Sequence, residues 1–93
     1  MTTSASDQGD GNLDANLGKL KNELRQVLTS SFSLAEGFDE RADLYRDLGM
    51  SSMQAMELLM ALEEGYAVKV PDEQFVEATS LERLARMMHG LMI

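Results

Sequence analysis

A pair of serines at the boundary between a loop and a helix is the feature that most restricts how this chain folds. Gly49, just before the boundary, allows a backbone conformation that other residues resist. Ser51 is a residue type preferred at a helix N-cap, and Gln54 completes an S-x-x-Q capping box. The helix is therefore predicted to begin at Ser52, with the Ser52 hydroxyl left free and pointing outward.

The helix predicted from Ser52 to about Glu64, with Gly65 ending it, carries two apolar faces. At about 100° per residue, one face is an ordinary core stripe of Ala55, Leu58, Leu59 and Leu62. The other is a methionine strip of Met53, Met56 and Met60, bordered by the carboxylates of Glu57, Glu63 and Glu64. The core stripe alone is enough to pack the helix against the bundle, so the second stripe needs another explanation. Because methionine side chains adapt to several partners, the strip is predicted to dock partners. The alternative is extra core against the preceding loop, with Met56 the most buried of the three.

The remaining segments predict further helices and no sheet. Steps of three and four residues between leucines predict a helix from Asp14 or Asn16 to about Ser30. A short helix is expected over residues 72–78 with Phe75 and Val76 as anchors, and a last helix opens at a Thr79–Glu82 capping box and ends at Gly90. The connection over residues 31–50 is too apolar for a free linker, so it should lie across the bundle. The fold class is all-α: a small antiparallel four-helix bundle, with three main helices, a short third helix and a long first loop.

Composition restricts the function classes. The chain has 93 residues, 44% of them hydrophobic, which suits one small domain over residues 13–93. Residues 1–12 are polar with nothing to bury and are expected to be disordered, and they resemble neither a signal nor a transit peptide, so we expect a cytoplasmic protein. The net charge of −8 argues against nucleic acid and anionic membranes and favours partners with basic patches. We expect a monomer.

The loop–helix stretch resembles the acyl carrier proteins. The resemblance is carried by residues 47–53 (DLGMSSM) and 57–64 (ELLMALEE), and it extends from about Leu17 to Met88. In that family the usual motif is D-L-G-x-D-S-L, and its serine carries 4′-phosphopantetheine through a phosphodiester. Ser52 occupies the serine position, whereas Ser51 replaces the usual Asp and Met53 replaces the usual Leu. Ser51 still caps the helix, and Leu to Met roughly conserves volume.

The resemblance implies a carrier that is not an enzyme. Ser52 would receive the prosthetic group from coenzyme A by a phosphopantetheinyl transferase, and the group would hold acyl intermediates as thioesters for fatty-acid, polyketide or related biosynthesis. Acyl-loading and acyl-processing enzymes would dock on residues around and beyond the serine: Asp47, Met53, Met56, Glu57, Met60 and Glu63. The family fold, a four-helix bundle with a short third helix, agrees with the periodicity.

The sequence does not favour an enzyme, and it leaves two alternatives to an acyl carrier. The single histidine, His89, has no evident carboxylate to orient it and, without Cys, makes no recognisable metal site, so neither a catalytic triad nor a metal centre is predicted. A peptidyl or aminoacyl carrier shares the fold and the prosthetic group. The third possibility is not a carrier: the chain would be an unmodified helical interaction module that docks partners through its methionine strip alone.

Overall fold

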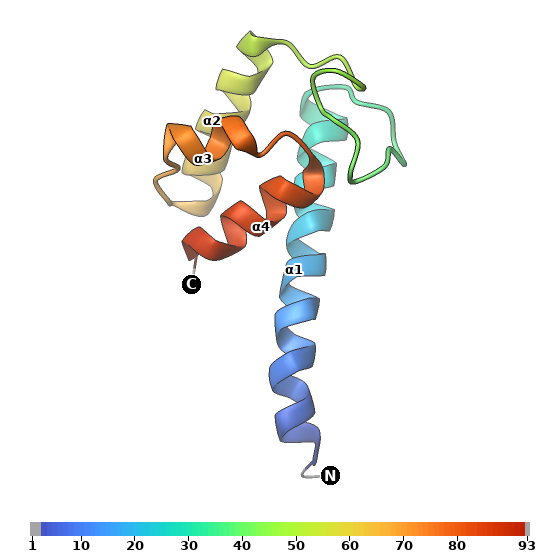
Figure 1. Ribbon diagram of the computed structural model, residues 1–93, viewed down its shortest axis with the longest axis vertical. Coiled ribbons are helices and arrows are strands. Elements are labelled where there is room, and N and C mark those ends of the chain that lie inside the picture. The colour runs from blue at the N-terminus through green and yellow to red at the C-terminus, as the bar shows by residue number, and fades with distance from the viewer. Residues whose placement is uncertain (1–2, 93) are drawn as a thin grey trace.

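The computed structural model describes the backbone of residues 3–92 and the side chains of residues 16–92. Four α-helices form this part of the chain: α1 (Thr3–Ser31), α2 (Ser52–Tyr66), α3 (Asp72–Glu77) and α4 (Leu81–Met92). Helix α2 runs opposite to α1, and α4 crosses α1 obliquely and packs against both α1 and α3 (Figure 1). The predicted all-α bundle with a short third helix is confirmed.

Helix α1 begins at Thr3, earlier than the predicted start at Asp14 or Asn16. No proline interrupts residues 3–31, so nothing in the sequence forces a break in the helical backbone. The first part of α1 extends beyond the other helices (Figure 1). Residues 1–2 lie outside the described residues, and the expected disorder of residues 1–12 in solution stays a prediction.

The core lies between the second half of α1, the other three helices and the long loop. Leucines from α1, α2 and α4 occupy its centre with almost no exposed surface. The most completely buried large side chains are Leu24, Leu28, Leu44, Leu58, Leu62, Leu81, Leu84 and Met88. The core stripe predicted for α2 is therefore confirmed, with Leu58 and Leu62 buried and Ala55 and Leu59 packed against them at its edge.

The long loop, residues 32–51, lies across the bundle as its apolar content predicts. Phe32, Leu34, Phe38, Leu44 and Met50 are buried in the core. Two backbone hydrogen bonds connect the loop to the start of α4. The Leu44 N–H donates to the Thr79 carbonyl over 2.8 Å, and the Glu82 N–H donates to the Glu40 carbonyl over 3.0 Å. The loop that leads to the two serines is thus fixed by the core on one side and by α4 on the other.

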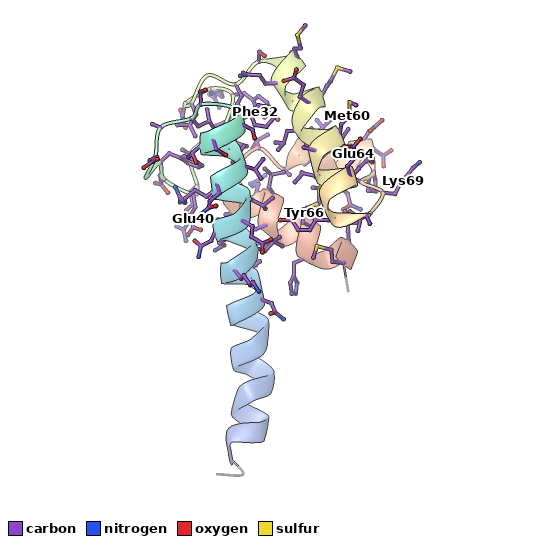
Figure 2. The ribbon with its side chains drawn as sticks, turned by 180° about the vertical axis from the view of Figure 1, so that it is seen from behind. Phe32, Glu40, Met60, Glu64, Tyr66 and Lys69 are labelled. Atoms are coloured by element: carbon purple, nitrogen blue, oxygen red, sulfur yellow. The ribbon has the colours of Figure 1, made fainter. Side chains whose placement is uncertain are left out.

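The predicted end of α2 at Gly65 is wrong. The helix continues through Tyr66, and Ala67 takes the left-handed conformation that ends it, with φ 54° and ψ 43°. The physical reason is tertiary: Tyr66 packs against the core, and its hydroxyl donates to the Glu23 carboxylate on α1 over 2.8 Å. The two additional helical residues, Gly65 and Tyr66, bring the Tyr66 side chain to that position at the end of α2 (Figure 2).

The predicted start and end of the last helix are also corrected. The N-cap is Ser80: its hydroxyl accepts from the Arg83 N–H over 3.2 Å, and its carbonyl accepts the first helical bond from the Leu84 N–H over 2.8 Å. The Thr79 carbonyl instead accepts from the Leu44 N–H in the long loop. Glu82 pairs with Arg41 and Arg86 instead of closing a capping box. Gly90 lies inside the helix, which ends at Met92. In α3 only one of the two predicted anchors is buried: Phe75 is 8% exposed, and Val76 is 70% exposed.

Candidate functional site

The capping box at the start of α2 is formed as the sequence predicts. The Gln54 N–H donates to the Ser51 hydroxyl over 3.1 Å, and the Ser51 N–H donates to the Gln54 side-chain oxygen over 2.9 Å. Ser51 has an extended backbone, with φ −92° and ψ 167°. Gly49 takes φ 80°, which turns the chain into the helix and which other residues adopt only under strain. The role of Ser51 is therefore to hold the end of the helix.

Ser52 is the first residue of α2, and its side chain is exposed. No hydrogen bond described in residues 16–92 engages its hydroxyl. A helix leaves its first N–H groups without intrahelical partners, and here the capping box uses those of Ser51 and Gln54. The N–H groups of Ser52 and Met53 remain available beside the hydroxyl. This pairing of a free hydroxyl with free N–H groups suits the attachment of an anionic group.

An open hollow of about 300 Å³ adjoins Ser52. Its other lining residues come from the long loop, α2, α3 and the α3–α4 connection: Tyr45, Ala55, Phe75, Val76 and Thr79. Most of these side chains are apolar or aromatic. Sequence analysis missed this hollow, because it is built from four segments whose proximity no local pattern reveals; the only signal was the pair Phe75 and Val76.

Asp47, predicted as a docking residue, lies five positions before Ser52 in an exposed turn. Its carboxylate accepts from the Asp43 N–H over 2.9 Å. The Asp43 carboxylate in turn accepts from the N–H groups of Arg46 and Tyr45, and these bonds hold the pKa of Asp43 below its usual value. Both carboxylates therefore also stabilise the turn that leads to the serines.

The three methionines of α2 are exposed. Met53 is 72% exposed, Met56 67% and Met60 59%, so the alternative that Met56 packs against the loop is wrong. Figure 2 shows Met60 and Glu64 on the side of α2 that faces away from α1. The strip is a continuous thioether surface that begins one residue after Ser52.

The carboxylates that border the strip differ in their exposure and in their hydrogen bonds. Glu57 and Glu64 are exposed. Glu63 is half-buried, and its carboxylate accepts from the Val70 N–H over 2.9 Å, which fixes the connection between α2 and α3. Glu63 thus has a structural role that the sequence did not reveal.

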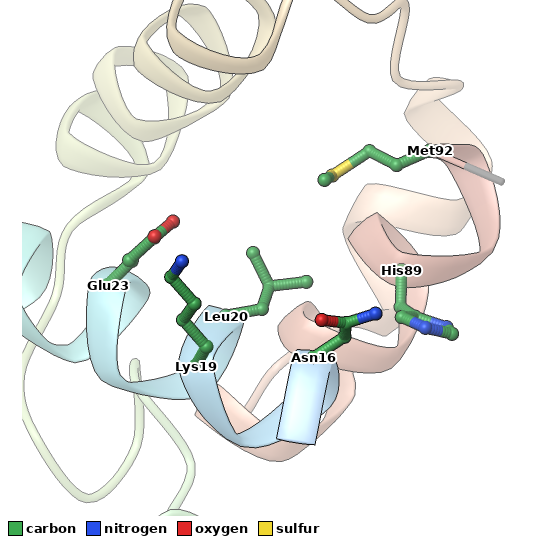
Figure 3. Close-up of a pocket in the computed structure, with 6 residues that line it drawn as sticks. All are labelled: Asn16, Lys19, Leu20, Glu23, His89 and Met92. Atoms are coloured by element: carbon green, nitrogen blue, oxygen red, sulfur yellow. The ribbon is translucent and has the colours of Figure 1, made fainter. Parts of the chain in front are cut away.

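A second hollow, of about 300 Å³, lies between α1 and the end of α4 (Figure 3). His89 lines it with Asn16, Lys19, Leu20, Glu23 and Met92. Ser52 is not part of it: α2 begins at the end of the bundle opposite to the end of α4 (Figure 1). The Glu23 carboxylate accepts from Tyr66. The structure does not bring the serine, the histidine and a carboxylate together.

Comparison with known proteins decides the family. Residues 19–88 match the family model described as "Phosphopantetheine attachment site". An acyl carrier protein of Campylobacter fetus is 30% identical over 70 residues, which cover 74% of this chain and 91% of that protein. The chain belongs to the acyl carrier protein family. The cofactor of this family is a covalently attached phosphopantetheine, and the exposed start of α2 fits such a group.

Two further acyl carrier proteins are similar to shorter parts of the chain. That of Helicobacter acinonychis is 36% identical over 53 residues, covering 56% of this chain and 68% of the relative. "Acyl carrier protein 3, mitochondrial" of Arabidopsis thaliana is 35% identical over 57 residues, covering 53% of this chain and 44% of the relative. The chain therefore spans less than half the length of the Arabidopsis relative. Within residues 3–92, none of the helices combines the length and hydropathy that a membrane span requires.

Proposed function

We propose that the chain is an acyl carrier protein in which the Ser52 hydroxyl carries 4′-phosphopantetheine. The observation that supports this most is the division of work between the two serines. The Ser51 side chain is used in the capping box, whereas the Ser52 side chain is exposed and its hydroxyl makes no hydrogen bond within residues 16–92. When bound, the group supplies a terminal thiol that holds acyl chains as thioesters, which a chain without Cys cannot otherwise provide.

The residues around Ser52 have distinct roles in this proposal. The N–H groups of Ser52 and Met53 favour the negative phosphodiester at the positive end of the helix. Tyr45, Phe75 and Val76 offer an apolar surface beside the attachment point. The Ser52 hydroxyl acts as a nucleophile only when the transferase attaches the group, and later acyl chemistry takes place on the thiol of that group. It acts by presenting the tethered group at high effective concentration to enzymes that catalyse the reactions.

We propose that the partners are a phosphopantetheinyl transferase and acyl-loading and acyl-processing enzymes. Their docking residues on this chain are Asp47, Met53, Met56, Glu57, Met60 and Glu63. The exposed thioethers would fill apolar hollows on the partner, and the carboxylates of Asp47, Glu57 and Glu63 would meet its Lys and Arg side chains. The proposed pathway is fatty-acid, polyketide or related biosynthesis in the cytoplasm, with the carrier as a monomer.

Modification is tested by intact mass. The protein is incubated with coenzyme A, Mg²⁺ and several broad phosphopantetheinyl transferases. The expected result is a mass gain of one phosphopantetheine, which is absent in Ser52→Ala and present in Ser51→Ala. No gain with any transferase would favour the unmodified docking module, whose methionine strip is exposed as that function requires. Loading of the modified protein with malonyl or aminoacyl donors separates an acyl carrier from a peptidyl carrier.

A further inference from the structure

The sulfur atoms of this protein are unevenly distributed over its surface. The chain has eight methionines and no cysteine, so thioethers are its only sulfur groups before modification. Met50 and Met88 are buried, with 5% and 0% of their surface exposed. The three methionines of α2 are the most exposed of those described, at 72%, 67% and 59%, followed by Met92 on α4 at 47%. Among the methionines of residues 16–92, an oxidant in solution therefore reaches those of the α2 strip most readily.

The strip also lies where a chemical change leaves the fold intact. Positions 53, 56 and 60 fall within about 60° of one another around the helix and span about 10 Å along it. The opposite face of α2 holds Leu58 and Leu62, which are 0% and 1% exposed and fix the helix to the core. A modification of the thioethers thus alters the outer surface of α2 without touching the contacts that stabilise the bundle.

We propose that Met53, Met56 and Met60 form a peroxide-sensitive modification site whose oxidation to sulfoxides weakens the docking of partner enzymes. This inference rests on the proposed function, because it takes the strip as the docking face. In each step a methionine sulfur attacks one peroxide oxygen; an S–O bond forms, the O–O bond breaks, and the second oxygen leaves as water. The thioether loses two electrons and the peroxide gains two. Methionine sulfoxide reductases reverse the change with electrons from a dithiol.

The sulfoxide weakens docking because it makes an apolar contact surface polar. Its oxygen is a hydrogen-bond acceptor that must be desolvated when a partner covers the strip. The exposed side chains that border the strip on α2, Glu57 and Glu64, are carboxylates, whose oxygens act as hydrogen-bond acceptors. These bordering carboxylates therefore offer the new oxygen no hydrogen bond to replace the water that a partner displaces, so the bound state is disfavoured relative to the free one.

The experiment uses the unmodified full chain. It is treated with hydrogen peroxide, the peroxide is removed with catalase, and the rate of phosphopantetheine transfer is measured afterwards, so that no thiol is present during oxidation. Among the methionines of residues 16–92, peptide mapping is expected to locate the added oxygens first on the three of the strip. The transfer rate at subsaturating protein is expected to fall about tenfold or more. Treatment with both methionine sulfoxide reductases should restore the mass and the rate together.

Two variants serve as controls. In the triple variant Met53→Leu, Met56→Leu, Met60→Leu, the ratio of the treated to the untreated rate is expected to stay near one, whatever the absolute rate. In Met92→Leu, which removes the exposed thioether of α4, the sensitivity of the parent protein should persist.

Several results would overturn the inference: an unchanged rate after the strip is oxidised, equal sensitivity in the triple variant, oxidation that spares the strip, or loss of helicity by circular dichroism at the same peroxide dose. The failure of the proposed function looks different, because the untreated protein would then gain no phosphopantetheine at all.

Discussion

Replacing each of the two serines by alanine should separate the stability of α2 from its modification. In Ser51→Ala the 3.1 Å bond from the Gln54 N–H to the Ser51 hydroxyl is lost, which leaves one N–H at the helix end to water. Loss of an N-cap side chain costs about 1 kcal/mol, within a range of about 0.5–2. For a domain of this size, about 1 kcal/mol lowers the melting temperature by roughly 4–8 °C.

Ser52→Ala should leave the stability nearly unchanged, within about 0.5 kcal/mol, because no bond is lost and alanine has the higher helix propensity. The assay is thermal unfolding by circular dichroism of both unmodified variants, with Ser51→Asp as the matched control. Aspartate also caps a helix and adds a favourable charge at its N-terminus, so it should restore the parent melting temperature or exceed it. The reasoning is refuted if Ser52→Ala is the destabilised variant and Ser51→Ala melts like the parent.

Three other outcomes follow from the structure. Ala67→Gly removes the strain of an alanine in the left-handed conformation, and Gly65→Ala replaces a glycine inside the helix at a position where a Cβ meets no other atom. Each substitution should raise the free energy of unfolding in urea by about 0.5–1 kcal/mol. Destabilisation by Gly65→Ala would place the end of the helix at Gly65 instead. Met60→Glu should leave helicity unchanged, because the side chain is 59% exposed, and should slow loading by partner enzymes about tenfold or more; unchanged loading rates would remove the strip from the docking face. Burial and the bond to Glu23 raise the pKa of Tyr66 from 10.0 to about 12, so stability present below pH 10 should decline toward pH 12, and Tyr66→Phe should flatten that decline.

The features predicted correctly from the sequence are those set by neighbours in the chain. The capping box needs only Ser51 and Gln54, three positions apart, and the core stripe of α2 needs only the helical period. The burial of the long loop followed from its apolar content, because so many exposed aromatic and leucine side chains would not be stable in water. The exposed position of Ser52 follows from the cap, since it is the next residue.

The features predicted wrongly are set by contacts between distant segments. Gly65 has the residue type that ends helices, yet the bond between Tyr66 and Glu23, 43 positions apart, accompanies a longer helix. Thr79 and Ser80 both suit an N-cap; in the structure Ser80 caps α4, and Thr79 bonds through its carbonyl to Leu44 in the long loop, 35 positions earlier. The hollow beside Ser52 and the second role of Glu63 likewise depend on which segments meet, and no local pattern encodes that.

The most direct test of the attachment site is the mass of the peptide that contains Ser51 and Ser52, taken from protein purified from the cells that make it. The predicted result is a peptide heavier by one phosphopantetheine, with fragmentation that places the group on Ser52. A peptide that is wholly unmodified, or one that carries the group on Ser51, would contradict it.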